Sequence, residues 1–170
     1  MKRLYFVRHG ESVLNRERVH AGQQDTPLTD LGREQARLAG DTARAIKFDI
    51  MVSSPLIRAL ETAQLIAEVT GYPLDRILTN PLFMERSFGS FEGHSWDETP
   101  DEGRYPDIET ETALLARARA GLEFLRELEA EDVLLVAHGS LGRALFAAVD
   151  QDRTYSDFDE LPNAEIVQLV

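Results

Sequence analysis

The chain alternates between short apolar runs and longer segments in which apolar residues recur at helical spacing. The short runs, rich in β-branched and aromatic residues, predict strands, and a repeat of three or four positions predicts helices. Strands are expected over residues 1–9, 49–53, 73–79, 133–137 and 165–170, and helices over 29–47, from the turn at 53–56 to Gly71, 111–130 and 141–149. This alternation predicts an α/β fold. We expect a three-layer sandwich with a mainly parallel central sheet flanked by helices, in a single domain over residues 1–170.

Two of the expected helices have recognisable ends and faces. Thr29 is a typical N-cap residue, and Asp30 stands in the first turn, where a carboxylate favours helix formation. The face predicted for this helix comprises Leu31, Gln35, Leu38 and Thr42. The face predicted for the following helix comprises Ala59, Ala63, Ile66 and Thr70, and Gly71 is expected to end it.

The ends of two predicted strands carry residues suited to catalysis. The first strand ends at Arg8 and His9 before Gly10, and a later apolar strand ends in the same way at His138 and Gly139. In an open α/β sheet, ligands bind beyond the carboxyl ends of the strands, where these side chains are presented. Each place has an ordinary alternative, because a solvated charged pair or a hydrogen-bonded histidine also closes strands. A zinc site at the two histidines is a further alternative.

Composition is typical of a globular protein. The 170 residues have the size of one ordinary domain, with 43% apolar and 28% charged residues. No apolar stretch approaches the roughly 20 residues that span a bilayer, and the first residues lack the apolar core and cleavage site of a signal peptide. We therefore expect a cytoplasmic protein that has no membrane partner.

Charge and cysteine content exclude several kinds of partner and chemistry. The chain has 30 acidic and 18 basic residues, and the net charge of −12 disfavours nucleic acid and anionic membranes as partners. An anionic substrate therefore needs a local basic pocket. The absence of cysteine excludes disulfides, zinc-thiolate sites and cysteine nucleophiles. Seven carboxylates, two prolines and a glycine over residues 97–111 predict a loop, whose only basic residue is Arg104.

Four separated motifs carry a resemblance to a known family. They are Leu4-Tyr5-Phe6-Val7-Arg8-His9-Gly10-Glu11-Ser12; Ser53-Ser54-Pro55-Leu56 with Arg58-Ala59 and Glu61-Thr62-Ala63; Glu85 before Phe88-Gly89 and Glu92-Gly93; and His138-Gly139. Between the first and second lie Asp25-Thr26-Pro27-Leu28-Thr29, Gly32 and Gln35-Ala36, which look like the segment that opens the family's first helix. Any one motif is weak, but four in this order make a chance resemblance very unlikely. Together they resemble the histidine phosphatase superfamily, the phosphoglycerate mutase-like proteins, over most of the chain.

The resemblance implies a set of catalytic residues. His9 would be the nucleophile and Glu85 the proton donor to the leaving oxygen, while Arg8, Arg58 and His138 would stabilise the phosphoryl oxygens. These residue types suit the chemistry, since a guanidinium holds phosphate oxygens with paired donors. A neutral imidazole attacks with one nitrogen if a group such as a backbone carbonyl holds the other as an N–H donor. His138 is expected to be protonated or at least an N–H donor.

The remaining positions have weaker assignments. The expected substrate-binding residues are Asn15, Gln23 and Gly139: Asn15 fits the family position whose amide contacts the phosphoryl group, Gln23 is placed to reach the same pocket, and Gly139 belongs to the fourth motif. Asn in a loop is more often a turn former, and without the resemblance Glu85 would be an ordinary salt-bridged residue, paired for example with Arg86. Where mutases of the family have Ser or Thr, this chain has Ala21. His20 and His94 are predicted to be surface loop residues.

The sequence favours a phosphatase over a mutase. Mutases of the family are generally longer and continue after their Glu-Arg with His-Tyr-Gly, whereas this chain reads Glu85-Arg86-Ser87-Phe88-Gly89 and has a short acidic loop in place of a basic insertion. We expect a phosphomonoester hydrolase that forms a phosphohistidine on a small phosphorylated metabolite. The alternatives are a phosphoglycerate mutase-type phosphotransferase and a non-catalytic phosphoryl-binding regulatory protein on the same fold.

The same reasoning gives expectations for ligands and partners. No cofactor and no metal are expected, because two arginines and a histidine can supply the charge that Mg²⁺ supplies elsewhere. Phosphate or sulfate should occupy the site. The sequence leaves the particular phosphomonoester and the oligomeric state open, a dimer included.

Overall fold

The computed structural model describes residues 1–150 and 152–170 and has one five-stranded sheet. Its strands are β1 (Arg3–Arg8), β2 (Ile50–Ser53), β3 (Leu78–Thr79), β4 (Asp132–Ala137) and β5 (Ile166–Gln168), in the order β3-β2-β4-β1-β5. β1 pairs in parallel with β4, which pairs in parallel with β2, and only β5 runs antiparallel, along the outer side of β1. The mainly parallel sheet expected from the sequence is confirmed.

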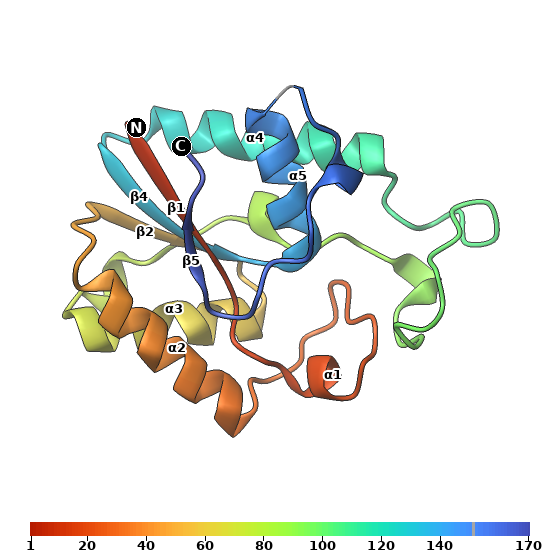
Figure 1. Ribbon diagram of the computed structural model, residues 1–170, viewed down its shortest axis with the longest axis horizontal. Coiled ribbons are helices and arrows are strands. Elements are labelled where there is room, and N and C mark those ends of the chain that lie inside the picture. The colour runs from red at the N-terminus through yellow and green to blue at the C-terminus, as the bar shows by residue number, and fades with distance from the viewer. Residues whose placement is uncertain (151) are drawn as a thin grey trace.

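Helices cover both faces of the sheet. In Figure 1, α4 (Glu111–Glu127) and α5 (Gly139–Val149) lie on one side of the strands, and α2 (Asp30–Ala43) and α3 (Ile57–Thr70) lie on the other. A single turn, α1 (Val13–Arg16), follows β1, and short 3₁₀ turns occupy Leu74–Arg76, Pro81–Phe83, Gly89–Phe91 and Tyr155–Asp157. The expected three-layer architecture is confirmed.

The buried strand β4 shows how the sequence divides the core between the two faces. All six of its residues are buried, and successive side chains point to opposite faces of a strand. Val133 and Leu135 pack with α4 and α5, while Leu134 and Val136 pack with α2 and α3. An apolar run without alternation is therefore the signature of a strand that is covered on both sides.

The predicted face of α2 is wrong. Thr29 caps the helix through its hydroxyl, as expected, but Leu31 and Leu38 are 54% and 58% exposed. The buried residues of α2 are small: Gly32, Ala36, Ala39, Gly40 and Ala43. They let α2 approach α3 closely, since a side-chain carbon on Gly40 would lie only 2.6 Å from Cβ of Val69. Close helix contact therefore decides the orientation of α2, and the larger apolar residues face outward.

Several boundaries also differ from the sequence-based expectation. The segment expected as a strand over 73–79 is mostly a 3₁₀ turn, and only Leu78 and Thr79 pair with β2. α2 ends at Ala43 rather than at Lys47, and α4 ends at Glu127 rather than at Ala130. α3 ends where Gly71 adopts a left-handed conformation with φ of 78°, as predicted.

The segments that hold the catalytic candidates lie at the carboxyl ends of β1 and β4. The chain leaves β1 at His9 and Gly10, and Gly10 lies so close to the carbonyl of Gly32 that no larger residue fits without a shift. The acidic stretch 97–110 contains no helix or strand and projects at the right of Figure 1. Within the described residues, no helix is both long and apolar enough to cross a membrane.

Candidate active site

A cavity of about 370 Å³ opens beyond the carboxyl ends of β1 and β4. Four of the five catalytic candidates lie together there. Arg8, His9, Arg58 and Glu85 line the cavity, while His138 is fully buried directly behind His9, with ring centroids 5.2 Å apart. The residues come from four separate segments of the chain, so only the fold brings them together.

The bonding partners of the His9 ring define its tautomer. Nδ1 lies 2.7 Å from the carbonyl oxygen of Gly10, which can only accept, so Nδ1 carries the hydrogen. Nε2 accepts from Nε of Arg58 at 3.2 Å. Burial, and then the positive charges of Arg58 and Arg8, hold the pKa of His9 well below its ordinary value. His9 is therefore a neutral imidazole whose Nε2 lone pair faces the cationic side of the cavity.

Arg58 is held on three sides in the first turn of α3. Besides His9, its guanidinium donates to the backbone carbonyls of Gln24 at 2.8 Å and Gly22 at 2.7 Å. The side chain is almost fully buried, and burial lowers the pKa of Arg58 while Glu85, Asp25 and Glu92 act in the opposite direction. Because a guanidinium remains protonated in proteins, the site keeps a fixed positive charge beside Nε2 of His9.

Arg8 is held by the segment that precedes β5. Its Nη1 donates to the carbonyl of Leu161 at 2.6 Å, and its Nη2 forms an ion pair with Glu160 at 2.8 Å. The same segment also binds the backbone of the strand end, since Ala164 N donates to the carbonyl of Arg8 and Asn163 Nδ2 donates to that of His9, both at 2.8 Å. The segment that precedes β5 therefore positions both Arg8 and His9.

His138 is fully buried. Burial, followed by the charge of Arg58, holds the pKa of His138 well below its ordinary value, which favours the neutral ring. Nε2 lies 2.7 Å from the hydroxyl oxygen of Ser54. Nδ1 is buried and has no hydrogen-bond partner within the described residues. Nδ1 is therefore the ring nitrogen whose hydrogen-bonding capacity is unused within the described residues.

Glu85 binds to the first turn of α5. Its Oε1 accepts from the backbone N–H groups of Leu141 at 3.0 Å and Arg86 at 2.8 Å, and its Oε2 accepts from that of Ser140 at 3.2 Å. The side chain of Arg86 instead pairs with Glu102 at 2.8 Å. The alternative of a salt bridge between Glu85 and the Arg86 side chain is therefore wrong. The carboxylate stands at a helix N-terminus on the cavity wall.

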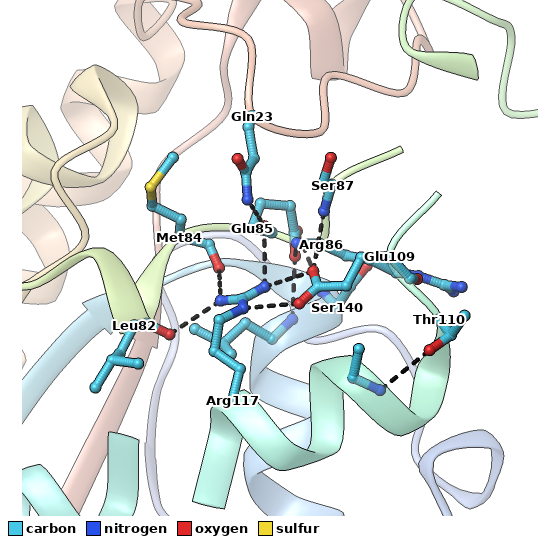
Figure 2. Close-up of polar contacts among 12 residues, drawn as sticks. Gln23, Leu82, Met84, Glu85, Arg86, Ser87, Glu109, Thr110, Arg117 and Ser140 are labelled. Atoms are coloured by element: carbon cyan, nitrogen blue, oxygen red, sulfur yellow. Dashed lines mark hydrogen bonds and ion pairs between the residues drawn. The ribbon is translucent and has the colours of Figure 1, made fainter. Parts of the chain in front are cut away.

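Arg117 of α4 holds the backbone around Glu85 (Figure 2). Two of its nitrogens donate to the carboxylate of Glu109, at 2.8 and 2.7 Å. The same guanidinium donates to the carbonyls of Leu82, Met84 and Glu85. Leu82 lies in the 3₁₀ turn Pro81–Phe83 and the other partners lie in irregular segments, so none of them belongs to a strand ladder or a long helix that would fix it. The sequence did not indicate this role, because nothing in the spacing of α4 distinguishes Arg117 from its other arginines.

The three substrate-binding candidates are placed differently from one another. Asn15 lines the cavity, and its carbonyl oxygen accepts from the backbone of Ser12, which leaves its amide N–H groups as donors. Gly139 also lines the cavity, beside Arg8. Gln23 does not line it: its amide donates to the carbonyl of Glu85 at 3.0 Å. Gln23 therefore positions Glu85 rather than contacting the contents of the cavity.

Other cavity residues were not singled out from the sequence. Arg143, Tyr155 and Glu160 line the wall formed by α5 and the segment after it. Arg143 stands one helical turn after Gly139, and this i, i+4 spacing was the one signal that could have found it. His20, predicted to be a surface loop residue, also lines the cavity and contacts Phe88 and Phe91. Burial lowers the pKa of His20.

The described residues show no metal-binding cluster. No group of three or more histidine, aspartate or glutamate side chains within 1–150 and 152–170 is arranged to hold an ion. The positive charge at the centre of the cavity comes from Arg8 and Arg58, which both act on the His9 ring. Such a cationic enclosure matches the spread negative charge of a phosphoryl group during transfer. The fold and the site together define a protein suited to phosphoryl transfer.

Comparison with known proteins identifies the family. A model of the histidine phosphatase superfamily (branch 1) matches residues 4–170, and the chain belongs to this superfamily. The uncharacterized phosphatase PhoE of Bacillus subtilis (strain 168) is 36% identical over 154 residues, which cover 88% of this chain and 78% of that protein.

Solved structures show the same fold under two functional names. A mycobacterial glucosyl-3-phosphoglycerate phosphatase superposes with a TM-score of 0.86 at 27% identity, covering 99% of this chain and 92% of that one. A phosphoglycerate mutase from Bacillus anthracis str. Sterne also superposes with a TM-score of 0.86, at 25% identity, covering 98% and 86%. The resemblance stated from the motifs is confirmed, and the backbone alone does not separate phosphatase from mutase.

Proposed function

We propose that the chain hydrolyses small phosphomonoesters through a phosphohistidine at His9. The observation that carries this proposal is the bonding of the His9 ring, in which Gly10 holds Nδ1–H and Nε2 faces Arg58 with its lone pair. This is the state in which an imidazole is a nucleophile. The phosphatase names of several relatives agree with it.

The geometry supports a two-step reaction. Nε2 of His9 attacks phosphorus, the bond from phosphorus to the ester oxygen breaks, and Glu85 gives a proton to that oxygen. Water then attacks the phosphohistidine, the bond between nitrogen and phosphorus breaks, and Glu85 takes the proton of the water. A bound phosphoryl dianion favours the protonated form of the neighbouring Glu85 carboxyl group, as the first step needs.

Two features favour hydrolysis over mutase chemistry. Arg86, which follows Glu85, is already paired with Glu102, and Arg8 is paired with Glu160. A bisphosphate would therefore meet carboxylates where a mutase needs unpaired positive charge. We expect release of inorganic phosphate to exceed any interconversion of phosphoglycerates. A non-catalytic regulatory role is less well supported, because each proposed catalytic position keeps its reactive group.

Several sequence-based expectations stay predictions. They are the single domain over residues 1–170, the cytoplasmic location, the open possibility of a dimer, the independence from metals and the occupation of the site by phosphate or sulfate. Residues Arg8, Arg58, His138 and Asn15 are the groups that would hold such an anion. Assays with and without a chelator test the metal expectation directly: loss of turnover that a divalent ion restores would contradict it.

Trapping the phosphoenzyme tests the mechanism. Labelled phosphomonoester, quenched in alkali during turnover, should give a phosphoprotein that is stable to alkali and labile to acid, with the label at His9. His9→Ala should lose the label and activity on the order of 10⁴-fold or more. An acid-stable phosphoprotein would identify a hydroxyl nucleophile instead.

A further inference from the structure

Two buried serines stand at the turn between β2 and α3. Ser53 and Ser54 are both inaccessible to solvent, and the proposed reaction uses neither hydroxyl. The backbone of Ser54 is held on both sides. Its N–H donates to the carbonyl of Val136 on the neighbouring strand β4 at 3.0 Å, and its carbonyl accepts from the Ser53 hydroxyl at 2.9 Å. The residue that carries the Ser54 hydroxyl is therefore fixed beside the last residues of β4.

The Ser54 hydroxyl has one hydrogen to donate and two contacts. Its oxygen accepts from the backbone N–H of Leu56 at 3.2 Å and lies 2.7 Å from Nε2 of His138. A backbone N–H only donates, so Nε2 is the one acceptor that the hydroxyl hydrogen has within the described residues. If Nε2 carried a hydrogen, the oxygen would face two donors and its own hydrogen would stay unbonded in a fully buried place. Such an unmade bond is costly, so the contacts favour Ser54 as donor and Nε2 as acceptor.

The other nitrogen of the His138 ring then carries the ring hydrogen. The lowered pKa of His138 favours the neutral ring, which has one N–H. With Nε2 as acceptor, that hydrogen is on Nδ1, which has no hydrogen-bond partner within the described residues. His138 is the N-cap of α5, but its ring accepts no bond from the helix, whose N–H groups at Ser140 and Leu141 bind Glu85. Nδ1–H is therefore a donor without an acceptor, on a ring centred 5.2 Å from that of His9.

We propose that Ser54 is a positioning residue that sets the tautomer of His138. By donating to Nε2, the hydroxyl keeps the ring hydrogen on Nδ1, and Nδ1–H donates to a phosphoryl oxygen during transfer at His9. The opposite tautomer would present a lone pair to an anion. A serine hydroxyl fixes the ring without adding negative charge, whereas a carboxylate in its place would repel a phosphoryl dianion. The proposal rests on the phosphatase function proposed above and adds the group that prepares one of its donors.

The tautomer is measurable on the unchanged protein. With ¹⁵N-labelled histidine, long-range ¹H–¹⁵N spectra distinguish a protonated ring nitrogen from a bare one, and the signals of His138 are those missing from His138→Gln. We expect Nδ1 of His138 to carry the hydrogen and Nε2 to be bare at neutral pH. A hydrogen on Nε2 would overturn the proposal. This measurement needs no substrate, so its outcome is separate from a failure to hydrolyse phosphomonoesters, which would contradict the phosphatase function instead.

Ser54→Ala tests the effect on catalysis, with Ser53→Ala as its matched control. Both variants remove a hydroxyl from the same buried turn, but only the hydroxyl of Ser54 contacts His138. Ser54→Ala leaves Nε2 without its donor, so hydrogen should appear on both ring nitrogens and kcat should fall about tenfold or more. Ser53→Ala should keep the Nδ1–H tautomer and most of kcat. Equal losses of kcat in the two variants would mean a general loosening of the turn and would overturn the proposal.

Two further comparisons test whether the hydroxyl acts through the ring. His138 acts on the phosphoryl oxygens, so Ser54→Ala should slow phosphoenzyme formation by the same factor for an alkyl phosphate and for a nitrophenyl phosphate. In a His138→Ala background, adding Ser54→Ala should lower kcat no further, because the group that the hydroxyl controls is gone. A loss that depends on the leaving group, or a full additional loss in the double variant, would show that Ser54 acts elsewhere and would overturn the proposal.

Discussion

The cavity has two ends that are built in different ways. At the inner end, His9, Arg58 and His138 are almost completely buried, and backbone carbonyls or a serine hydroxyl hold their rings and guanidinium. At the outer wall, formed by α5 and the segment that precedes β5, Arg143 lies on an aromatic ring and Glu160 is mostly exposed. The inner groups are buried and held by several hydrogen bonds, whereas the wall groups are held by an aromatic ring and by one ion pair with Arg8.

This difference separates chemistry from selection. A phosphoryl group is common to every phosphomonoester, so the inner end should act on all of them alike. Whatever distinguishes one substrate from another must contact the rest of the cavity, of which this wall is a part. Changes at the inner end should therefore lower all rates by a similar factor, and changes at the wall should alter their ratios.

Among changes that leave His9 in place, Arg58→Lys should give the largest effect, a loss of about 10²–10³ in kcat for every phosphomonoester. Lysine keeps the charge but cannot donate at once to His9, Gln24 and Gly22, and it loses the planar arrangement of donors. Steady-state kinetics on ethyl phosphate and phosphoserine measure the loss, with thermal unfolding as a check of folding. Near-normal turnover would show that charge alone matters at this position.

The loss of rate in Glu85→Gln should be the next largest, and its size should depend on the leaving group. An alkyl phosphate needs a proton on its leaving oxygen, so phosphoenzyme formation should slow by about 10²-fold, whereas a nitrophenyl phosphate leaves without that proton. Rapid-quench measurement of the first step compares the two. Equal losses for both substrates would mean that Glu85, bound to the first turn of α5, positions the site rather than donating a proton.

Arg117→Lys should lower kcat by about tenfold with little change in KM, because ammonium cannot replace the paired bonds to Glu109 and the bonds to three carbonyls. The loss should be larger for the alkyl phosphate, since the displaced residue is Glu85. Arg119→Lys, on the exposed side of the same helix, is the matched control. A loss independent of the leaving group would point to general loosening of the fold.

The inner end should also make stability depend on pH, the smallest of these effects. His9 and His138 are neutral when folded because their pKa values are lowered, but an unfolded histidine takes up a proton below about pH 6.5. The unfolded state then binds more protons, so the free energy of unfolding should fall as pH drops below that value, by at most about 1.4 kcal/mol per pH unit for each histidine. Urea unfolding between pH 7.5 and 5.5 measures the slope.

A variant assigns this slope to its source. His138→Gln removes one of the two buried rings and should reduce the slope by the share of one histidine. An unchanged slope would mean that His138 can take up a proton within the folded protein.

The inner end could be predicted from sequence because its residues stand at the ends of strands. Apolar runs end at His9 and His138, and parallel strands place their carboxyl ends at one edge, so both histidines had to meet there. The tautomer of His9 also followed from chemistry, since a nearby carbonyl was the simplest partner. The structure confirms that carbonyl as Gly10.

The outer wall could not be predicted in the same way. Glu160 and Asn163 lie in an irregular segment, where no periodicity shows which way a side chain points, and Arg8 is more than 150 positions away in the chain. Gln23 was expected to line the cavity because its place in the loop lets it reach the same pocket as Asn15. Its amide instead donates a hydrogen bond to the carbonyl of Glu85. The prediction of the buried face of α2 was wrong for another reason. Close packing against α3 places glycine and alanine on the buried face and leaves leucine outside.

The order of the strands has a consequence for synthesis of the protein. β1 is made first, yet its two neighbours in the sheet, β4 and β5, are made from residue 132 onward. During translation, the backbone groups of the strand that ends at Arg8 therefore remain without their sheet partners until nearly the whole chain has left the ribosome. Contacts between such distant segments form slowly, so this apolar strand is the part of a nascent chain most in need of a chaperone.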